Sequence, residues 1–308
     1  MYMVNRRRFL TGAGALVAGT VGLGGYATAF EAGTRLDVTA YTVSPAGWPV
    51  DLTLKIAVIA DIHACEPWMP AERIASIVDL ANAQNPDLTV LLGDFAGAQH
   101  FVTRYVPPGA WAEQLARLEA PLGVYAILGN HDWWSAAIPT DPPDNGQSVR
   151  NVVLSAGVPV LENSAVALSQ NGRPFWLVGL GDQLAHPWGR RHSHGNDDLE
   201  SALRQINDEA PAILLAHEPF VFPRVPDRIA LTLCGHTHGG QVNLPIIGAP
   251  FVPTMRGVKR YVYGLYTEGK RQMIVSGGLG TSHLPVRFLR PPEVVCVTVR
   301  GAESAYSA

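Results

Sequence analysis

Apolar residues gather in short, nearly continuous runs that polar or glycine-rich segments separate. Such runs predict strands covered on both faces, because a strand with one exposed face would alternate apolar and polar residues. The strongest predicted strands span residues 52–60, 88–92, 123–128, 212–216 and 231–234. We expect further strands at residues 34–43, 165–168, 175–180, 261–266, 271–276 and 294–300. Asn171-Gly172 predicts a tight turn between two of them, as in an edge hairpin or a second sheet.

Helical segments are predicted between several of these strands. The clearest is 71–83, where apolar residues recur at helical spacing until Asn85-Pro86 ends the pattern. The other predicted helices span residues 111–119, 146–156 and 197–206. The order of elements therefore predicts an α/β protein that is richer in sheet than a simple doubly wound fold. No linker divides the chain after its first thirty residues.

Side chains that bind metals follow the apolar runs directly. Where two such residues are two positions apart at a strand end, their side chains point to the same side. Residues 231–240, LTLCGHTHGG, show this most clearly, and Gly239 and Gly240 are expected to let the backbone pass close to whatever the two imidazoles hold. The candidate metal ligands at the strand ends are Asp61, His63, Asp94, Asn130, His217, His236 and His238.

This mixture of carboxylate, imidazole and amide suits Mn, Fe or Zn better than Mg or Ca, which prefer oxygen ligands alone. Seven ligands are too many for one ion, but two ions can share them if one carboxylate bridges and a water completes the site. A pair of ions roughly 3.5–4 Å apart lowers the pKa of the bridging water and stabilises the attacking and leaving oxygens of an in-line displacement. The set therefore predicts hydrolysis of phosphate esters.

Composition narrows the alternatives. The 308 residues carry a net charge of -3, which gives no general attraction to polyanions, so we expect no nucleic-acid partner. Three cysteines, Cys65, Cys234 and Cys296, make neither a disulfide framework nor a zinc motif, and we interpret them as small buried residues.

Residues 1–30 resemble a twin-arginine export signal. Arg6 and Arg7 precede Phe9 and Leu10, and an uncharged run rich in glycine and alanine follows. We expect export through the twin-arginine translocation machinery to a periplasmic or other extracytoplasmic location. The sequence Ala27-Thr28-Ala29 suits cleavage, and the alternative is that the segment stays as a membrane anchor.

Five motifs follow one another along the chain: DIH, GD, GNHD, a single His after a strand, and GHTH. In this order they are similar to the five motifs of the calcineurin-like metallophosphoesterase family. The later stretches GHTHGGQVNLPIIG, YVYGLY and VSGGLGTSHLPVRF resemble the bacterial, often twin-arginine-exported branch of that family. This resemblance implies that residues 31–308 form one domain, a four-layer α/β/β/α sandwich of two mixed sheets flanked by helices. It also implies that the site lies at the carboxyl edges of the sheets.

The resemblance further implies how the ligands divide between two ions. Asp94 would bridge, Asp61, His63 and His238 would hold one ion with it, and the remaining three would hold the other: Asn130, His217 and His236.

Four more residues are candidates for catalysis or substrate binding. By its place in GNHD, His131 lies beside the metals, where a protonated imidazole assists the leaving group. Asp132 either orients His131 or caps the following helix. Arg287 either binds a phosphate oxygen or forms a structural ion pair. Trp133 either forms one wall of a groove for the leaving group or packs as an ordinary helix residue.

Two positions depart from related families. Protein Ser/Thr phosphatases of this superfamily carry a second Asp where this chain has Gly97, and purple acid phosphatases carry a Tyr ligand there. The resemblance therefore argues against a protein phosphatase, and we expect no purple iron chromophore, because Gly97 cannot ligate a metal. Gly277-Gly278 replaces the Arg that usually precedes GLG in the bacterial branch, which weakens any claim of phosphate contacts at that point.

We therefore expect a monomeric enzyme that cleaves phosphodiesters or pyrophosphates of small or lipid-linked substrates. One alternative is an enzyme specific for lipid-linked or nucleotide-linked pyrophosphates of the envelope. The alternative outside catalysis is an envelope-binding protein that a metal site stabilises. The polar loop 183–195, which carries three histidines and two arginines, is either a lid that faces the substrate or a solvated surface loop.

Overall fold

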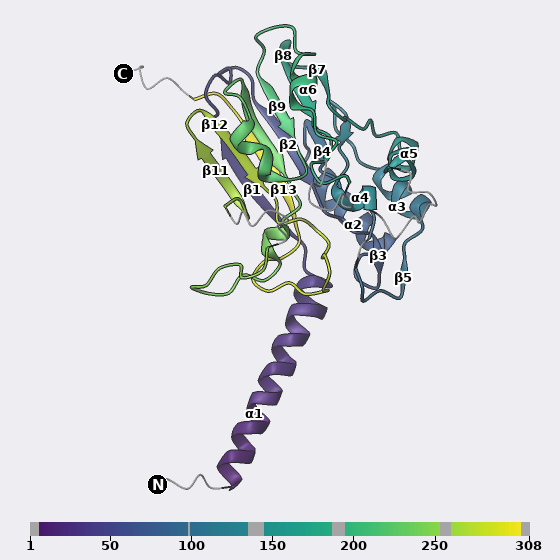
Figure 1. The fold of residues 1–308 in the computed structure, drawn as a ribbon, viewed down its shortest axis with the longest axis vertical. Helices are drawn as coiled ribbons and strands as arrows, with labels where there is room; N and C mark the ends of the chain where they lie inside the picture. The colour runs from purple at the N-terminus through teal and green to yellow at the C-terminus, as the bar shows by residue number, and fades with distance from the viewer. Residues whose placement is uncertain (1–5, 98, 135–144, 187–194, 253–259, 303–308) are drawn as a thin grey trace.

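Two β-sheets stacked face to face form the body of the protein in a computed structural model, with helices on their outer faces (Figure 1). The structure describes residues 6–97, 99–134, 145–186, 195–252 and 260–302. The first sheet has the strand order β1 (Asp37–Val43), β13 (Glu293–Val299), β2 (Leu54–Ile59), β4 (Leu88–Leu91) and β6 (Val124–Ala126). The second has the order β11 (Gly264–Glu268), β12 (Arg271–Val275), β10 (Ile229–Cys234), β9 (Ala212–Leu215), β8 (Arg173–Gly179) and β7 (Ser164–Gln170).

Strand direction brings the chemistry to one edge of each sheet. In the first sheet β2, β4 and β6 are parallel, so the residues that follow them lie at a common edge. In the second sheet β8, β9, β10 and β12 are parallel in the same way. The strands β13 and β1 run the opposite way to β2, so each of them begins at the edge where β2 ends.

Three apolar clusters separate four layers. The central cluster lies between the sheets and joins residues such as Ile56 and Val90 to Ile213 and Leu233. A second cluster packs the outer face of the first sheet against three helices, α2 (Ala71–Ala83), α3 (Pro108–Leu115) and α5 (Gln147–Ser155). A third covers the outer face of the second sheet with α6 (Leu199–Leu203) and the 3-10 helix η2 (Pro219–Arg224). The predicted α/β/β/α fold is confirmed.

Smaller elements complete the edge that carries the site. The strands β3 (Cys65–Glu66) and β5 (Arg104–Tyr105) form a two-stranded ribbon. The short helix α4 (Asn130–Trp134) and the 3-10 turn η3 (His238–Gly240) begin at predicted ligands.

Most predicted elements are confirmed within a few residues, and α2 spans exactly the predicted 71–83. The hairpin of β7 and β8 turns at Asn171 and Gly172, both with positive φ, and forms an edge of the second sheet. The three cysteines are buried and free, as expected. The structure corrects two boundaries: α3 begins and ends earlier than 111–119, and α6 is shorter than 197–206.

The expected strand at 261–266 is wrong in its first half, because β11 begins only at Gly264. The backbone amides of Val262 and Tyr263 donate to the hydroxyl of Tyr266, at 2.9 and 3.3 Å, instead of joining a ladder. The Tyr261 ring packs edge-on against Phe222 and Tyr266. Aromatic packing therefore replaces strand pairing in this segment.

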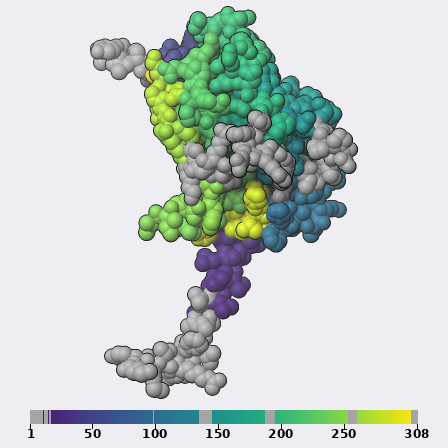
Figure 2. Space-filling model, in the orientation of Figure 1, coloured from purple at the N-terminus to yellow at the C-terminus, as the bar shows by residue number. Residues whose placement is uncertain are grey.

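The N-terminal helix α1 (Arg6–Gly25) projects from the body of the protein (Figures 1 and 2). It continues as the π-helix η1 (Tyr26–Ala32), which contacts the body. Glu31 is buried and accepts a hydrogen bond from the Arg290 amide at 2.6 Å, and the carbonyl of Ala27 accepts from the Arg287 amide at 3.0 Å. None of the helices in the described residues has the length and hydropathy that a membrane span requires. The roles expected of residues 1–30, signal or anchor, stay predictions.

Candidate metal centre

The strand ends of both sheets converge on one buried cluster. The first sheet supplies Asp61 and His63 after β2, Asp94 after β4 and Asn130 after β6. The second supplies His217 after β9, and His236 and His238 after β10. All seven predicted ligands are buried, so the structure brings together side chains that lie far apart in the sequence. Their role as ligands stays a prediction, which the geometry below supports.

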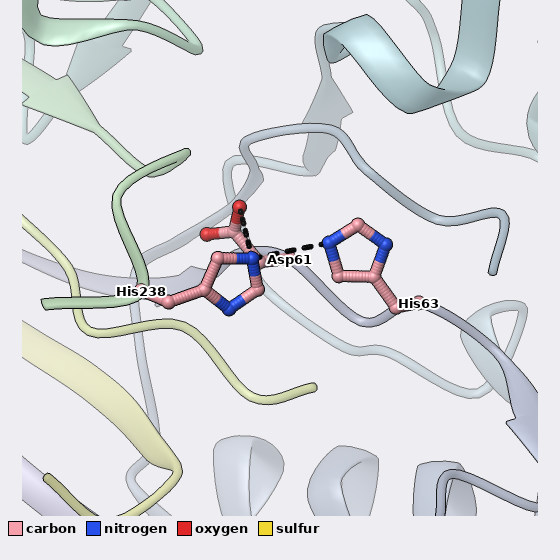
Figure 3. A group of neighbouring side chains, drawn as sticks. All are labelled: Asp61, His63 and His238. Carbon is pink, nitrogen blue, oxygen red and sulfur yellow. Dashed lines mark hydrogen bonds and ion pairs between the residues drawn. The ribbon is translucent and has the colours of Figure 1, made fainter. Parts of the chain in front are cut away.

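One group centres on Asp61 (Figure 3). The Nε2 atoms of His63 and His238 lie 3.2 Å apart, and His238 Nε2 lies 3.7 Å from Asp61 Oδ1. Each of the three residues offers a ligand atom within 4.8 Å of the others. Two ring nitrogens and a carboxylate oxygen thus face one small volume, as the ligands of a shared cation do.

Asp94 lies between this group and the next. Its Oδ2 is 3.4 Å from His63 Nε2 and 3.2 Å from His217 Nε2, while its Oδ1 accepts from the His131 amide at 2.8 Å. Burial alone would raise the pKa of Asp94, but His217 and His131 lower it well below the usual range. One oxygen shared by two imidazoles is the geometry that a bridging carboxylate needs.

The second group contains His217, His236 and Asn130. His236 Nδ1 lies 2.9 Å from Asn130 Oδ1, and its ring is edge-on to that of His217, with centroids 5.2 Å apart. The His236 amide donates to both oxygens of Asp61, at 2.9 and 3.1 Å, which ties this group to the first. Glu218 also offers an oxygen to His217 and His236 within 4.8 Å.

The ring nitrogens fit a cation. The Nδ1 atoms of His63 and His217 donate to the carbonyls of Ala96 and Leu92, at 3.2 and 2.6 Å, so each Nε2 keeps a lone pair that points into the cluster. Within the described part of the chain, the buried Nε2 atom of His236 has no hydrogen-bond partner, and that of His217 faces Oδ2 of Asp94 at 3.2 Å. A buried polar atom without a partner is costly, and a bound ion would supply one.

Burial also keeps the imidazoles of His63 and His236 neutral, as metal binding requires. His217 differs: burial lowers its pKa, but the charge of Asp94 overcomes this and raises the pKa well above the usual value, so a bound ion would replace a proton there. Burial lowers the pKa of His63 and of His236 to about 3. It raises the pKa of Asp61 to about 7, and the charge of Asp94 adds to this rise. A carboxylate that is reluctant to ionise in an apolar surrounding gains most from a neighbouring cation.

The backbone of the cluster is strained at five predicted ligands. Their φ angles are positive, a region that residues other than glycine rarely occupy. The angles are 55° at Asp61, 49° at His63, 57° at Asp94, 69° at His236 and 51° at His238. Strain of this kind persists where the surrounding fold holds it, and it is frequent at functional sites.

Glycine is required where the backbone passes the ligands most closely. A Cβ added to Gly129 would lie 2.5 Å from Asp94 Oδ1 and 2.6 Å from His217 Cε1. The expectation for Gly239 and Gly240 needs correction, because a Cβ there would meet Arg290 Cδ at 2.6 Å and Ala249 Cβ at 2.5 Å. Those two glycines accommodate the packing of neighbouring loops and positive φ angles, not an approach to the metals.

The carboxylate of Asp132 binds the backbone of two turns, which differs from both roles expected of it. Its buried carboxylate accepts four backbone N–H bonds, from Asp94 (2.8 Å), Phe95 (2.9 Å), Ala96 (3.1 Å) and Gly129 (2.9 Å). Burial and the charge of Asp94 raise its pKa to about 7, and the N–H donors of Gly129 and Ala96 oppose this rise. Asp132 therefore holds the GD turn against the GNHD turn, which positions Asp94.

His131 is half-buried beside the ligands. Its ring lies edge-on to that of His63, with centroids 5.0 Å apart, and to Trp134 at 5.4 Å. Burial lowers its pKa, and His217 and His283 lower it further against the charge of Asp94. His283 stacks on His100, with ring centroids 6.2 Å apart, and both are exposed. Of these two histidines, His283 is near enough to act on the pKa of His131, and the motif pattern gave no signal for either.

Arg287 is buried, and its guanidinium faces backbone carbonyls. It donates to the carbonyls of Gly277 (2.9 Å), Gly280 (3.0 Å) and Arg290 (3.1 Å), and its Nη2 lies 3.4 Å from His238 Nδ1. This geometry favours a structural role, though with carbonyls and not with the ion pair considered from the sequence. Arg287 fixes the loop of residues 276–292 beside His238.

Trp133 packs under the guanidinium of Arg150, 5.8 Å from the ring centroid, and against the apolar cluster of α2, α3 and α5. Its ring is also edge-on to that of His186, at 5.2 Å. These contacts favour packing over a substrate-facing wall. Most of the loop 183–195, including Arg190, Arg191, His192 and His194, lies outside the described residues.

A buried acid pair behind the cluster escaped the sequence analysis. The carboxyls of Asp182 and Glu218 are both buried, and burial with the charge of Glu218 raises the pKa of Asp182 well above the usual range. Gln183 supports Glu218 by donating from its amide and side chain, at 3.1 and 2.7 Å, to the carboxylate and the carbonyl. Asp182 follows strand β8, as the predicted ligands follow theirs, and this spacing was the only available signal.

The structure also shows why Gly97 departs from the phosphatase pattern. A Cβ at this position would lie 2.8 Å from the Ala64 carbonyl and 3.0 Å from the Tyr105 ring. Neither Asp nor Tyr fits there without moving the ribbon of β3 and β5.

Two stacked mixed sheets thus place this cluster at the carboxyl ends of their parallel strands. The model of the family described as calcineurin-like phosphoesterase matches residues 54–240. An uncharacterized metallophosphoesterase of Bacillus subtilis, YkuE, is 31% identical over 97% of this chain and 99% of its own. The phosphodiesterase YaeI of Escherichia coli is 31% identical over 95% of this chain and 98% of its own. A dimetal phosphatase structure from Danio rerio is 12% identical, with a TM-score of 0.39 over 75% of this chain and 88% of that one.

The chain therefore belongs to the calcineurin-like phosphoesterase family, and it is a phosphoester hydrolase. Divalent metal ions are the cofactors that the family and the His and Asp clusters indicate.

Proposed function

We propose that the enzyme hydrolyses phosphodiesters with two divalent ions, held by the seven clustered ligands with Asp94 as the bridge. The observation that carries this proposal is the convergence of buried imidazoles on Asp61 and Asp94, with the Nε2 atom of His236 left without a hydrogen-bond partner in the described residues. When bound, the ions would activate a water and neutralise charge on the phosphoryl group. The name phosphodiesterase, which the Escherichia coli relative carries, supports the choice of substrate class.

Other side chains position the ligands and supply a proton. Asp132 positions Asp94 through four backbone amides, and the carbonyls of Ala96 and Leu92 orient His63 and His217. His131 is half-buried beside the ligands, and we assign to it the proton that the leaving oxygen takes up. Its lowered pKa makes the protonated ring a readier donor, although a smaller fraction is protonated at neutral pH.

The test is turnover of bis(p-nitrophenyl) phosphate by purified protein supplied with Mn or Zn. Asp94→Asn should reduce kcat/KM by about a hundredfold or more, because it removes the bridging charge. Asp79→Asn, an exposed carboxylate on α2, is the matched control and should leave turnover unchanged. Full activity in Asp94→Asn would rule out the proposed bridge.

His131 separates an enzyme from a metal-stabilised binding protein, the alternative without catalysis. His131→Ala should lose about 10²–10⁴-fold in kcat while the protein keeps its metals, since general acid catalysis contributes about that much. His186→Ala, an exposed imidazole, serves as control. Unchanged kcat in His131→Ala would remove this residue from the mechanism. Substrate panels would distinguish simple diesters from the lipid-linked or nucleotide-linked pyrophosphates of the narrower alternative.

We also propose export by the twin-arginine route, with the protein in an extracytoplasmic compartment. Arg6 and Arg7 at the start of an uncharged segment support it. Replacing both by Lys should block export of a reporter fusion, while Arg8→Lys should not. Export of the Lys-Lys variant at the original rate would contradict this route.

A further inference from the structure

Exposed apolar side chains collect at the edge that carries the metal centre. They lie on η1 and on loops far apart in the sequence: Phe30, Phe101, Ile246, Ile247, Phe251 and Leu284. The loop of residues 276–292 connects these segments. Gln99 donates to the Thr281 carbonyl at 2.6 Å, and the Phe288 amide donates to the Gln241 carbonyl at 2.9 Å. Glu31 accepts from the Arg290 amide, so η1 joins the same group.

The tip of the loop 241–252, the green loop at the lower left of Figure 1, is the most prominent part of this edge. Leu244 and Gly248 close a tight turn with two hydrogen bonds of 2.8 Å. Ile246 and Ile247 at its apex are 106% and 71% exposed. Ile246 also has a φ of 71°, which is unfavourable for a β-branched residue. Neither packing nor backbone preference explains isoleucine here, so a partner for its side chain is indicated.

The helix α1 leaves the body at the same edge (Figures 1 and 2). No charged residue occurs between Phe9 and Phe30, and Val17, Val21 and Leu23 are exposed. The exposed apolar side chains of the loops and the uncharged helix α1 therefore lie at the same edge of the protein.

We propose that this edge docks on a lipid bilayer, with the Ile246-Ile247 tip inserted among the acyl chains beside α1. Separate apolar tips that stand clear of the body suit lipid, which adapts to any shape. A protein partner would instead need a contiguous, complementary patch. Two anchoring elements also suit stable attachment better than one, because a single weak apolar segment binds membranes reversibly.

Docking in this way turns the metal centre toward the lipid surface. Phe101 and Leu284 directly adjoin His100 and His283, the exposed histidines beside His131. The substrates best placed to reach the centre are then phosphoesters carried on lipid head groups. This second step rests on the proposed function, whereas the docking surface does not.

The experiment is flotation of the full chain with vesicles of phosphatidylethanolamine and phosphatidylglycerol in equal parts. Replacing Ile246 and Ile247 by Asn, which tolerates positive φ, should reduce the ratio of bound to free protein by about tenfold or more. Phe251→Ser provides a second variant in the same loop. Val50→Asn is the matched control: Val50 is 69% exposed on the loop that follows β1 at the opposite edge, and its replacement should change nothing.

Equal binding of the wild type and the loop variants would overturn the proposal, as would no binding by the wild type. Self-association of the wild type without lipid, lost in the loop variants, would also overturn it and make the surface an interface between copies. Flotation needs no activity, so it decides docking even if turnover is absent. With turnover present, hydrolysis of a phosphodiester lipid in vesicles should fall in the loop variants, while that of bis(p-nitrophenyl) phosphate stays at the wild-type rate.

Discussion

At the scale of single residues, the centre depends on side chains that hold other side chains in place. Asp132 is the clearest case, since one buried carboxylate satisfies four backbone amides from two turns. Arg287 does similar work for the loop beside His238. The motif pattern identified both residues but suggested other roles, because a motif gives residue types and spacing and not hydrogen-bond partners.

Asp132→Ala should lower the free energy of unfolding by roughly 3 kcal/mol or more, because it leaves buried N–H groups without acceptors. Asp79→Ala, which removes one exposed ion pair with Arg117, should cost roughly 0.5 kcal/mol. Urea denaturation of both variants measures the difference. Equal losses would mean that the four amides find other partners.

Asp182→Asn tests the buried acid pair. The pKa of Asp182 is raised well above its unfolded value, so the folded state holds its proton more tightly. The resulting stability is complete below the unfolded pKa, near about 4, and is lost as pH rises toward the folded pKa. Asn has no proton to lose.

The variant should therefore be more stable than the wild type by roughly 1 kcal/mol at pH 8, and its stability should depend less on pH above about 4. Urea midpoints of the metal-free protein across this range give the answer. A variant whose pH dependence matches the wild type would show that Asp182 titrates normally.

At the scale of elements, the turn after each parallel strand is the unit that builds the centre. These turns combine positive φ angles with close backbone approach, and at Gly129 the approach is to the ligand side chains of Asp94 and His217. The end of a strand sets the side to which a ligand side chain points, while the turn that follows sets the distance between ligands.

Gly129→Ala should displace Asp94 or His217 and reduce metal-dependent turnover by about tenfold or more, since small misplacements at a reactive centre are costly. Gly109→Ala is the control, because a Cβ there meets nothing within 4 Å and α3 should gain helix propensity. Turnover of both variants on bis(p-nitrophenyl) phosphate is the measurement. Wild-type turnover in Gly129→Ala would show that this turn tolerates displacement.

Sequence patterns predicted elements well where periodicity and turn chemistry agreed. The helix α2 and the Asn171-Gly172 hairpin are examples. They failed at 261–263, where Tyr261 packs against Phe222 and Tyr266, and at the ends of α3 and α6. Those outcomes depend on tertiary contacts that no local pattern contains.

At the scale of the whole molecule, the sequence predicted the layers and the edge at which the seven ligands meet. It could not predict the acid pair of Asp182 and Glu218 or the histidines beside His131, because these contacts join separate loops. The sequence also could not predict the surface of exposed apolar side chains beside the metal centre, because they come from segments that meet only in the folded protein.

Metal ions should stabilise the entire fold, since the ligands come from both sheets and the unfolded chain has no preformed site. At a free concentration about a thousandfold above Kd, each ion should add roughly 4 kcal/mol, and the two together should raise Tm by roughly 10 °C. Thermal unfolding with Mn or Zn, and again after chelation, measures this shift. No change in Tm on chelation would contradict a site shared by the two sheets.

The most direct test of the central claim is the metal content of purified protein, measured by elemental analysis beside its Asp94→Asn variant. We predict two ions per wild-type chain and fewer in the variant, because Asp94 is the ligand placed between the two groups. Less than one ion per wild-type chain, or equal content in the variant, would contradict a metal pair at this centre.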